Sequence, residues 1–486
     1  MRSGHDTIVA LATARGQSAL AVIRLSGPDA VRMVAGIFAG TDLRAAASHT
    51  VHVGTLRGAD GDLLDQVVVT LFLAPRSVTG ENVVEISCHG GDVASTLVME
   101  RLVEAGARPA GPGEFTQRAF LNGKMDLAQA ESVGALIHAR SVKAHRVSMA
   151  HLTGRYSALL ARFRDELLDL VAFLELELDF SEEDVEFADR ARLEQAFKDG
   201  RALLADLVAS YRYGRSLVDG VRVAIAGRPN AGKSTLLNAV VGDDRAIVSD
   251  VAGTTRDSIE AESEFDGHRF IWIDTAGLRE TANAIEQEGV ARARRAVSHA
   301  DVLVYVYDVT VGLGDDEVAF LEEVSGTRSD SSVGPQGIPV VLVANKTDLI
   351  APASAPAPAP AAVSSPESPR LSQSPSTPSP VRISASRMLA ERRLPDTVLQ
   401  RVLDAALGDG SATEEHRTVT SARHVAHLRA ALEALERAET AFHAGASGDM
   451  LVEDLRRAMD ELGLVTGALS NEDVLDRIFS QFCIGK

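Results

Sequence analysis

The eight residues at 227–234, Gly-Arg-Pro-Asn-Ala-Gly-Lys-Ser, fit the pattern G-x-x-x-x-G-K-[ST] of loops that bind nucleotide phosphates. An apolar run at 221–226 precedes them, and apolar residues at helical spacing follow at 236–240. In such a loop, backbone N–H groups surround the β-phosphate and the helix N-terminus adds positive potential. Lys233 would reach the β- and γ-phosphates, and the Ser234 hydroxyl would bind Mg²⁺. The alternative is a glycine-rich turn with a chance lysine, and the strand and helix on its two sides count against it.

Two further motifs support a nucleotide site. Residues 274–277, Asp-Thr-Ala-Gly, follow an apolar run at 270–273, which places a carboxylate near the metal and a glycine N–H near the γ-phosphate. Residues 253–257, Gly-Thr-Thr-Arg-Asp, form a candidate switch loop in which Thr255 would contact the γ-phosphate and Mg²⁺.

The motif at 345–348, Asn-Lys-Thr-Asp, follows a third apolar run and specifies the base. The carboxylate of Asp348 would accept hydrogen bonds from the N1–H and the exocyclic amine of guanine, which predicts GTP rather than ATP. Ser-Ala-Ser at 384–386 is a weaker candidate for the last base-contacting loop. Together the motifs predict a GTPase. The predicted nucleotide contacts are Asn230, Ala231, Gly232, Lys233, Ser234, Thr235, Ser249, Thr254, Thr255, Asp274, Thr275, Ala276, Gly277, Asn345, Lys346, Asp348, Ser384, Ala385 and Ser386.

Leu278 stands where many GTPases carry a glutamine that orients the attacking water, and leucine cannot orient water. Arg256 could act as an arginine finger, but a salt bridge within the switch loop is an equally good interpretation. The sequence therefore predicts that the water-orienting group comes from elsewhere.

Composition limits the other classes of function. The chain has 486 residues, which is enough for about three domains, and a formal charge of −19, which argues against binding polyanions by bulk charge. Its two cysteines lie far apart in the sequence, so neither a disulfide framework nor a zinc cluster is expected. With no apolar run near the roughly 18 residues of a membrane helix and no signal peptide, the prediction is a cytoplasmic protein without membrane contact.

Residues 1–122 are predicted to form an α/β domain. Segments with β-branched content predict strands at 6–12, 19–25, 65–73 and 83–87, and helical spacing predicts helices at 28–38 and 92–105. Cys88 and His89 could suggest a nucleophile with its base. Adjacent side chains on a strand point to opposite faces, so a tight turn at the two glycines that follow is favoured.

The remaining chain is predicted to be a helical domain split by the GTPase domain. Its first part is 123–217, the inserted GTPase domain is 218–409, and its second part is 410–486. Residues 351–380 consist mainly of proline, serine and alanine and are predicted to form a disordered surface loop. The acidic segment at 175–186 could mean metal or acid–base chemistry, but a solvated helix end is favoured.

Beyond the four nucleotide motifs, the segment 112–124 (Pro-Gly-Glu-Phe-Thr-Gln-Arg-Ala-Phe-Leu-Asn-Gly-Lys) and the terminal Cys-Ile-Gly-Lys resemble the MnmE (TrmE) family of tRNA modification GTPases, of the TrmE-Era-Der-type class. The resemblance covers nearly the whole chain. It implies an α/β and α multidomain fold, in which an N-terminal folate-binding-like and dimerisation domain and a helical domain accompany an inserted Ras-like P-loop GTPase domain. The segment 351–380 departs from the family pattern.

The resemblance also implies particular roles. A reduced folate, 5-formyl- or 5,10-methylene-tetrahydrofolate, would bind Arg24, Glu85, Lys124 and Lys486. Potassium would bind Asn230 and the carbonyls of Ser249, Val251 and Thr254, Glu286 would orient the attacking water, and Cys483 is either a nucleophile or an inert thiol. Members of the family form homodimers. Each homodimer assembles with the flavin-dependent MnmG protein into a heterotetramer. It adds an aminomethyl or carboxymethylaminomethyl group at carbon 5 of the tRNA wobble uridine.

Two other functions stay open at this point. A ribosome-assembly GTPase would share the nucleotide motifs, but it would be expected to carry a basic RNA-binding module or a second GTPase domain. A folate-dependent aminomethyl transferase regulated by GTP is the other alternative.

Overall fold

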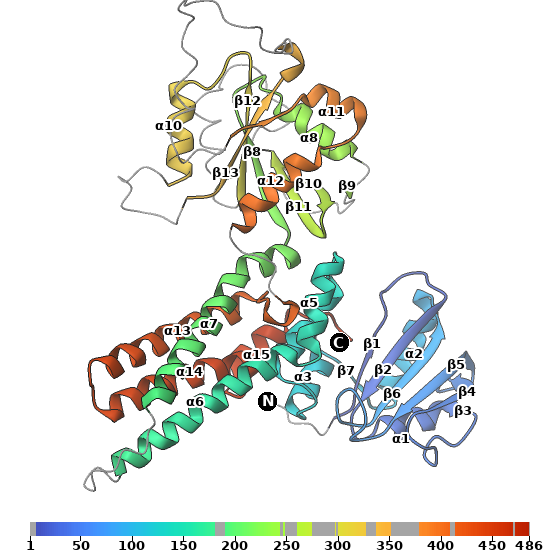
Figure 1. Cartoon of the computed structure of the whole chain (residues 1–486). Helices are drawn as coiled ribbons and strands as arrows, with labels where there is room; N and C mark the ends of the chain where they lie inside the picture. Colours follow the sequence, from blue (N-terminus) through green and yellow to red (C-terminus); the bar gives the residue numbers. More distant parts are fainter. Residues whose placement is uncertain are drawn as a thin grey trace, which may run out of the picture. The chain divides into compact units, whose positions relative to one another are not determined.

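The computed structural model of the chain describes residues 6–179, 190–243, 246–247, 260–274, 297, 300–326, 337–350, 379–408, 414–469 and 472–485. The chain forms two compact units, each with its own seven-stranded sheet (Figure 1). The first unit comprises Met1–His138, Val147–Asp206 and Arg423–Lys486, and the second comprises Ala139–Arg146 and Leu207–Ala422.

The sheet of the first unit consists of β1 (Ile8–Leu11), β2 (Leu20–Ser26), β3 (Phe38–Ala39), β4 (Thr50–Arg57), β5 (Leu63–Phe72), β6 (Val83–His89) and β7 (Arg108–Pro109). The strand order is β3-β4-β5-β6-β2-β1-β7, and only β1 and β7 pair in parallel. Helices α1 (Ala30–Ile37) and α2 (Asp92–Glu104) pack Val34 and Val98 into the core on the sheet. Burial of these apolar side chains is what holds the helices to the strands.

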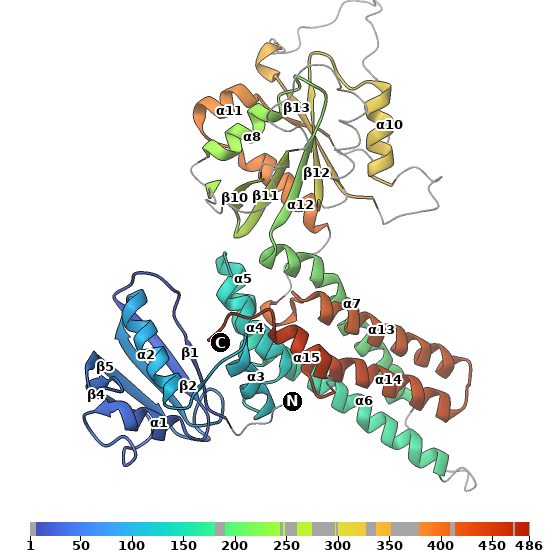
Figure 2. The ribbon, with the colours of Figure 1, turned by 180° about the vertical axis from the view of Figure 1, so that it is seen from behind.

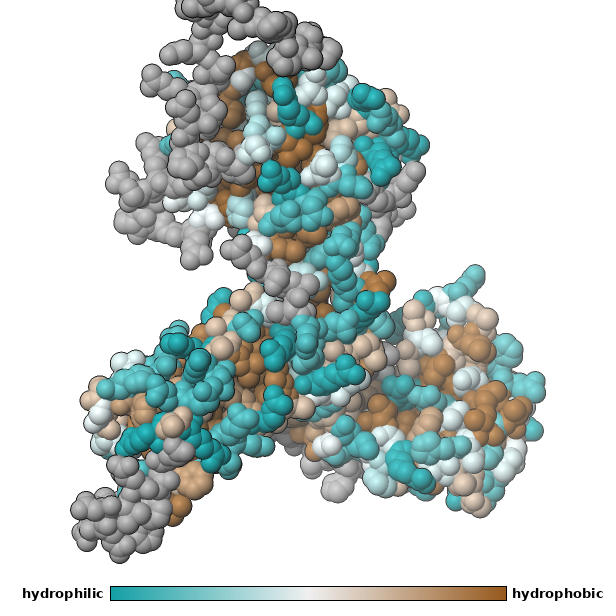
Figure 3. All heavy atoms as spheres, in the orientation of Figure 1, coloured by the Kyte–Doolittle hydropathy of each residue, from teal (hydrophilic) through white to brown (hydrophobic). Residues whose placement is uncertain are grey.

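All six elements predicted for this region are present, within a few residues at each end. The strand β4 was not predicted. Its outward positions carry Val51 and Val53, which are more than half exposed, so the sequence lacks the apolar–polar alternation of a half-buried strand. Figure 3 shows apolar side chains on the surface of this sheet domain.

The geometry at Cys88 and His89 favours the glycine turn. Cys88 is buried, whereas His89 is exposed on the other side of β6 and its Nδ1 lies 2.6 Å from the Asp65 carboxylate. The N–H of Gly90 donates to the Ala19 carbonyl, and a Cβ at Gly90 would lie 2.3 Å from the Ser18 carbonyl oxygen. A glycine is therefore required at this turn, and the two side chains cannot act as a nucleophile–base pair.

Helices make up the rest of the first unit together with parts of the second. They are α3 (Glu114–Leu121), α4 (Leu127–His138), α5 (Val142–Leu152), α6 (Arg155–Asp179), α7 (Arg190–Val218), α13 (Ala422–His443), α14 (Gly448–Thr466) and α15 (Glu472–Phe479). In the sequence, some of these helices precede and others follow the long segment that forms most of the second unit, as a split helical domain requires.

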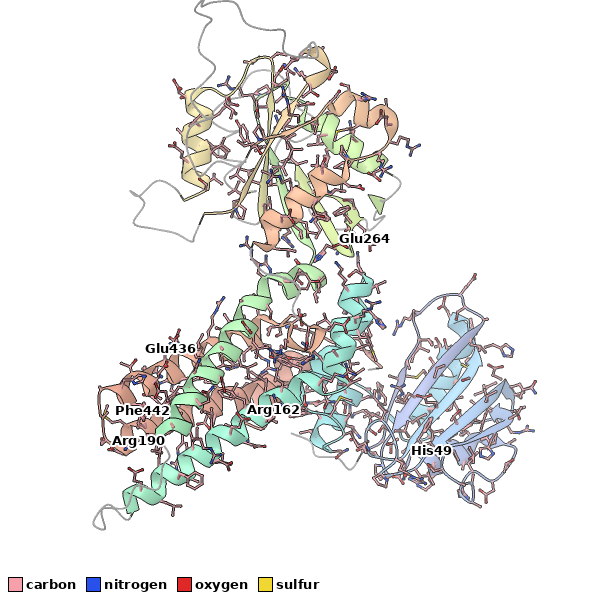
Figure 4. The ribbon with its side chains drawn as sticks, viewed as in Figure 1. His49, Arg162, Arg190, Glu264, Glu436 and Phe442 are labelled. Carbon is pink, nitrogen blue, oxygen red and sulfur yellow. The ribbon has the colours of Figure 1, made fainter. Side chains whose placement is uncertain are left out.

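Three contacts within the first unit join the two sequence-distant groups of helices. The guanidinium of Arg201 on α7 pairs with Glu439 on α13 at 3.2 Å. The guanidinium of Arg190 lies over the ring of Phe442, 5.6 Å from its centroid (Figure 4). Gly200 approaches Leu435 so closely that a Cβ there would lie 3.0 Å from a Leu435 methyl group. The two helical segments therefore pack together.

The sheet of the second unit consists of β8 (Val221–Ala226), β9 (Ala246–Ile247), β10 (Glu260–Phe265), β11 (His268–Asp274), β12 (Val302–Asp308), β13 (Val340–Asn345) and β14 (Val381–Arg382). The order is β14-β13-β12-β8-β11-β10-β9, and the strands from β14 to β11 are parallel. The central strands consist mainly of valine, isoleucine, leucine and alanine, as expected for strands that are buried on both faces.

Helices cover both faces of this sheet (Figure 2). The helices α8 (Lys233–Gly242), α11 (Ala385–Glu391) and α12 (Asp396–Leu407) pack on one face, where Leu236, Met388 and Val402 are buried. The helix α10 (Asp315–Val324) packs on the other face and buries Val324 against Leu303. This doubly wound layout places the loops that follow the parallel strands at one edge of the sheet.

The predicted fold class, a mixed α/β and α multidomain chain with a P-loop domain inserted into a helical one, is confirmed. The predicted boundaries 1–122, 123–217, 218–409 and 410–486 stay predictions; the second unit extends beyond 218–409 on both sides. Residues 351–378 of the predicted disordered loop lie outside the described part of the chain. Among the described helices, none is both long and apolar enough to cross a membrane.

Candidate nucleotide-binding site

The topology of the second unit brings the predicted nucleotide motifs to one edge of its sheet. The strands β11, β8, β12 and β13 run in parallel, so their carboxyl ends lie side by side. The phosphate-loop segment 227–234 follows β8, Asp274 is the last residue of β11, and Asn345 is the last residue of β13. In open α/β sheets this edge is where ligands bind.

Glycines and one asparagine allow the loop at 227–234 to close tightly. Gly227 has φ 147°, and a Cβ there would lie 2.0 Å from the Val306 carbonyl oxygen. Gly232 has φ 102°, and a Cβ there would lie 2.1 Å from the Asn345 amide nitrogen. Asn230 also has a positive φ, 62°. Side chains at the two glycine positions would collide with the neighbouring loop or strand, so the loop conformation depends on glycine.

The helix α8 begins at Lys233 with Gly232 as its N-cap and no side-chain cap. Its first-turn N–H groups are therefore available to an anion, which the positive end of the helix favours. Ser234 is exposed and Thr235 is partly exposed in this first turn. A serine hydroxyl here fits a Mg²⁺ ion bound together with nucleotide phosphates.

The ammonium group of Lys233 donates to the carbonyl oxygens of Gly227 at 2.8 Å and Arg228 at 2.9 Å. The side chain therefore folds back over its own loop. Its charge lies where the phosphates of a bound nucleotide would be held, and these would be stronger acceptors than neutral carbonyls.

Asn345 connects three of the predicted motif loops. Its side-chain nitrogen donates to the carbonyl of Ala231 at 2.8 Å, and its side-chain oxygen accepts from the N–H of Ala385 at 2.8 Å. The residue is 3% exposed. The amide therefore fixes the phosphate loop and the loop at 384–386 relative to β13.

The other members of the two base-contacting loops lie around Asn345. Lys346 has φ 63°, and its ammonium pairs with the Asp308 carboxylate at 2.7 Å. Asp348 is exposed in the short 3-10 helix Thr347–Leu349. Ser384 caps α11 by accepting a hydrogen bond from the Arg387 N–H, and Ser386 is exposed in the first turn of that helix. The carboxylate of Asp348 is accessible to a ligand from solvent.

Asp308 was not singled out from the sequence. Hydrogen bonds from the Lys346 ammonium and from Thr310 hold the pKa of Asp308 at about 2. The signal was present in the sequence: an aspartate directly follows the apolar run Val-Leu-Val-Tyr-Val-Tyr at 302–307, as Asp274 follows its own strand. Asp308 orients the lysine of the base-contacting motif.

Several predicted site residues lie outside the described residues. They are Ser249, Val251, Thr254, Thr255, Thr275, Ala276, Gly277, Glu286 and Lys486. For Asp274 the structure describes the end of β11 but not the side chain. The switch loop, the potassium ligands and the water-orienting glutamate therefore stay predictions.

The predicted folate residues belong to the first unit. Arg24 on β2 pairs with Glu85, which is directly opposite on β6, at 2.8 Å, and its guanidinium lies over the ring of Phe115 at 5.8 Å. Lys124 donates to the Pro75 carbonyl at 3.1 Å. Arg24 and Glu85 thus form a charged pair on the sheet, and their role in folate binding stays a prediction.

The C-terminal tail also reaches this sheet domain. Ile484 forms a β-bridge with Pro112, and the Gly113 N–H donates to the Cys483 carbonyl at 3.4 Å. Gly485 packs against β1, where a Cβ would lie 2.4 Å from the Leu11 carbonyl oxygen. The thiol-bearing Cys483 is exposed. Residues 483–485 are thereby held next to β1, the neighbour of the strand that carries Arg24.

The acidic segment at 175–186 shows ordinary ion pairs where it is described. Glu175 pairs with Arg456 at 2.5 Å and Glu177 with Arg190 at 3.2 Å. Within the described residues, no three histidine, cysteine, aspartate or glutamate side chains are grouped so that they could hold a metal ion. Residues 180–186 of this segment lie outside the described residues, so the solvated helix end stays a prediction.

Comparisons with known proteins match the whole chain. A family model described as "GTP-binding protein TrmE N-terminus" matches residues 7–124, and one described as "MnmE helical domain" matches residues 127–483. The "tRNA modification GTPase MnmE" of Salinibacter ruber is 51% identical over 484 residues, covering 100% of both chains. The protein of the same name from Cytophaga hutchinsonii is 40% identical over 481 residues, covering 99% of this chain and 98% of that one.

A solved structure of an Aquifex aeolicus Era variant bound to GDP.AlF4⁻ is 27% identical, covering 44% of this chain and 66% of that one. Its TM-score of 0.25 is too low to support an argument.

Proposed function

We propose how this chain functions from the family to which it belongs. It is a member of the MnmE family of tRNA modification GTPases, and is therefore a GTP hydrolase that acts in tRNA modification. GTP and Mg²⁺ bind at the edge of the second sheet. The loop at 227–234 holds the phosphates, and the loops at 345–348 and 384–386 hold the guanine. The observation that carries this assignment is the side chain of Asn345, which bonds to Ala231 and to Ala385 and so joins the phosphate loop to the base loops.

The residues act on GTP mainly by positioning and by charge, which dominate phosphoryl transfer. The N–H groups of α8 and the Lys233 ammonium bind the phosphates, and Asp348 accepts from the guanine edge. Ser234 and Thr255 would hold Mg²⁺, which would supply positive charge to the phosphates. Glu286 holds the attacking water, since Leu278 cannot.

Potassium takes the place of an arginine finger in this proposal. Asn230, whose positive φ is part of the loop conformation, contributes its side-chain oxygen, and Ser249, Val251 and Thr254 contribute carbonyls. We expect GTP hydrolysis to be faster in potassium than in sodium, because sodium is the smaller ion and would fit poorly in a carbonyl cage suited to potassium. Steady-state rates in matched chloride salts test this. Asn230→Ala should remove the difference between the salts and keep Mg²⁺-dependent GTP binding; equal rates in the unmodified protein would refute the cage.

Folate binding and assembly complete the proposed function. A reduced folate, 5-formyl- or 5,10-methylene-tetrahydrofolate, binds near Arg24, Glu85 and Lys124 with help from Lys486, and supplies a one-carbon unit. The chain acts as a homodimer with a flavin-dependent MnmG partner, in a heterotetramer that modifies carbon 5 of the tRNA wobble uridine. The charged pair of Arg24 and Glu85 and the tail held at the same sheet support the folate site in this proposal.

Nucleoside mass spectrometry of tRNA tests the function directly. Cells that lack the chain should lose the aminomethyl-type modification of the wobble uridine, and the unmodified gene should restore it. A Lys233→Ala gene should fail to restore it although the protein accumulates normally. Unchanged wobble uridine in the deletion strain would reject the proposal, and full restoration by the Lys233→Ala gene would separate tRNA modification from GTP hydrolysis.

A further inference from the structure

We infer that Glu317 is a positioning residue for the phosphate-binding loop. It anchors the Arg228 side chain, and through Arg228 it fixes the carbonyl oxygen that accepts from Lys233. The inference rests on the proposed nucleotide site and adds to it a residue from α10, outside every nucleotide motif of the sequence.

Both oxygens of the Glu317 carboxylate have fixed partners. Glu317 lies in the first turn of α10 and is 6% exposed. One oxygen accepts from the Gly314 N–H at 2.7 Å, which caps the helix, and the other accepts from the Tyr305 hydroxyl at 2.7 Å. A buried carboxylate with two such partners cannot rotate freely, so it is a rigid point of attachment.

Tyr305 ties this carboxylate to the centre of the sheet. It lies on β12, and its register partner on β8 is Ala226, the last residue before the phosphate loop. The tyrosine is 5% exposed; burial and the hydrogen bond to Glu317 raise the pKa of its hydroxyl, so it stays a donor at neutral pH. The Glu317 anchor is therefore built on the strands next to the loop it serves.

Arg228 connects the anchor to the loop. Its Nε lies 3.1 Å from the same Glu317 oxygen that caps α10. A Cβ at Gly314 would lie 2.2 Å from an Arg228 guanidinium nitrogen, so the side chain lies against the helix N-terminus. The main-chain carbonyl of Arg228 accepts from the Lys233 ammonium at 2.9 Å and from the Ala231 N–H at 3.2 Å. Holding the Arg228 side chain thus fixes the carbonyl that orients both residues.

The charges favour positioning over direct contact with the nucleotide. A free carboxylate near a phosphate site would repel the ligand, but this one is paired with Arg228 and bonded to two further donors. Removing Glu317 frees the guanidinium and the loop carbonyl together. Neutralising an exposed carboxylate next to Glu317 on the same helix should free neither the guanidinium nor the loop carbonyl.

The test is nucleotide affinity of the full-length protein, measured by fluorescence titration with mant-GTP and mant-GDP. Glu317→Gln and Arg228→Ala should each weaken mant-GTP binding roughly five- to tenfold, because each removes one charge-assisted hydrogen bond. The loss should be larger for mant-GTP than for mant-GDP, since Lys233 also reaches the γ-phosphate. The affinity of the double variant for mant-GTP should be no lower than that of the more affected single variant, because the two residues act as one unit. Asp316→Asn, at an exposed position next to Glu317, is the matched control and should bind like the unmodified protein.

Each alternative result has a defined meaning. Unchanged or tighter binding in Glu317→Gln, equal losses for GTP and GDP, or additive losses in the double variant would overturn the inference. If Glu317→Gln does not fold, Arg228→Ala decides alone, since the Arg228 side chain is 48% exposed. If Lys233→Ala binds mant-GTP as well as the unmodified protein does, the proposed nucleotide site itself is wrong and Glu317 is not the cause.

Discussion

At the scale of single residues, the Asn345 side chain connects two loops of the proposed nucleotide site. Its amide donates to the Ala231 carbonyl and accepts from the Ala385 N–H, so it serves two loops that are far apart in the sequence. A buried amide with both ends bonded is costly to replace, because its partners would lose their hydrogen bonds inside the protein.

Asn345→Ala should therefore weaken GTP binding roughly tenfold or more and lower the melting temperature, since the Ala231 carbonyl and the Ala385 N–H are left unpaired. Equilibrium binding of mant-GTP and thermal unfolding measure the two effects. Asn238→Ala, at an exposed position on α8 in the same unit, is the control and should change neither. Normal affinity in Asn345→Ala would show that the loops are held by other contacts.

At the scale of elements, the strands that carry nucleotide motifs could be predicted because each apolar run ends in a recognisable motif. The segments 221–226, 270–273 and 340–344 were predicted and form β8, β11 and β13. The strand β12 lies between β8 and β13 but was missed, because the single aspartate that ends it, Asp308, is a weaker signal than the motifs that follow the other strands. The role of Glu317 could not be found from sequence, since Tyr305 and Arg228 lie 12 and 89 residues away from it and only the fold brings these partners together.

The hairpin of β10 and β11 packs on the end of α7 through a buried histidine. His268 is 1% exposed, its Nδ1 lies 3.3 Å from the Ser216 hydroxyl, and its ring meets Tyr213 edge-on. Burial, followed by the nearby Lys143 ammonium, lowers the pKa of His268 to about 4, although Asp266 opposes this. In the unfolded chain the same histidine titrates near 6.5.

Between about pH 6.5 and pH 4 the unfolded chain therefore binds a proton that the folded chain does not, so stability should fall as the pH falls through this window. The contribution of this one histidine should be up to about 3 kcal/mol. We expect His268→Gln to flatten the pH dependence of thermal unfolding between pH 7.5 and pH 4.5. The exposed His138→Gln should not flatten it, and an unchanged profile in His268→Gln would mean that the imidazole is not kept neutral.

At the scale of the whole chain, residues 483–485 contact the N-terminal sheet domain within the first unit. The tail at 483–485 lies against β1 and the start of α3, and the phenyl rings of Phe479 and Phe482 pack together at 5.6 Å just before it. A terminal segment held this closely to a sheet that carries a charged pair is suited to complete a ligand site there.

Deleting residues 483–486 from the otherwise intact chain should abolish binding of 5-formyl-tetrahydrofolate while leaving GTP binding intact. The physical reason is that Lys486 and its tether are lost, whereas the second unit is untouched. Isothermal titration calorimetry with each ligand measures both. Cys483→Ser should bind folate normally and so separates the tail's binding role from any chemistry of the thiol; folate affinity that survives the deletion would remove the tail from the site.

The central claim, that the second unit binds and hydrolyses GTP through a guanine-reading carboxylate, is tested most directly by changing that carboxylate. Asp348→Asn keeps one acceptor oxygen and replaces the other by an NH2 donor, which cannot accept from the guanine amine. GTP hydrolysis at low nucleotide concentration should therefore fall by roughly 100-fold or more. Xanthosine triphosphate, which carries an oxygen where guanine carries its amine, should become the better substrate. The measurement is kcat/KM for GTP, ATP and xanthosine triphosphate in the unmodified and variant proteins, in potassium. The account predicts GTP preference in the first and xanthosine triphosphate preference in the second; equal use of ATP and GTP by the unmodified protein, or an unchanged GTP preference in Asp348→Asn, would contradict it.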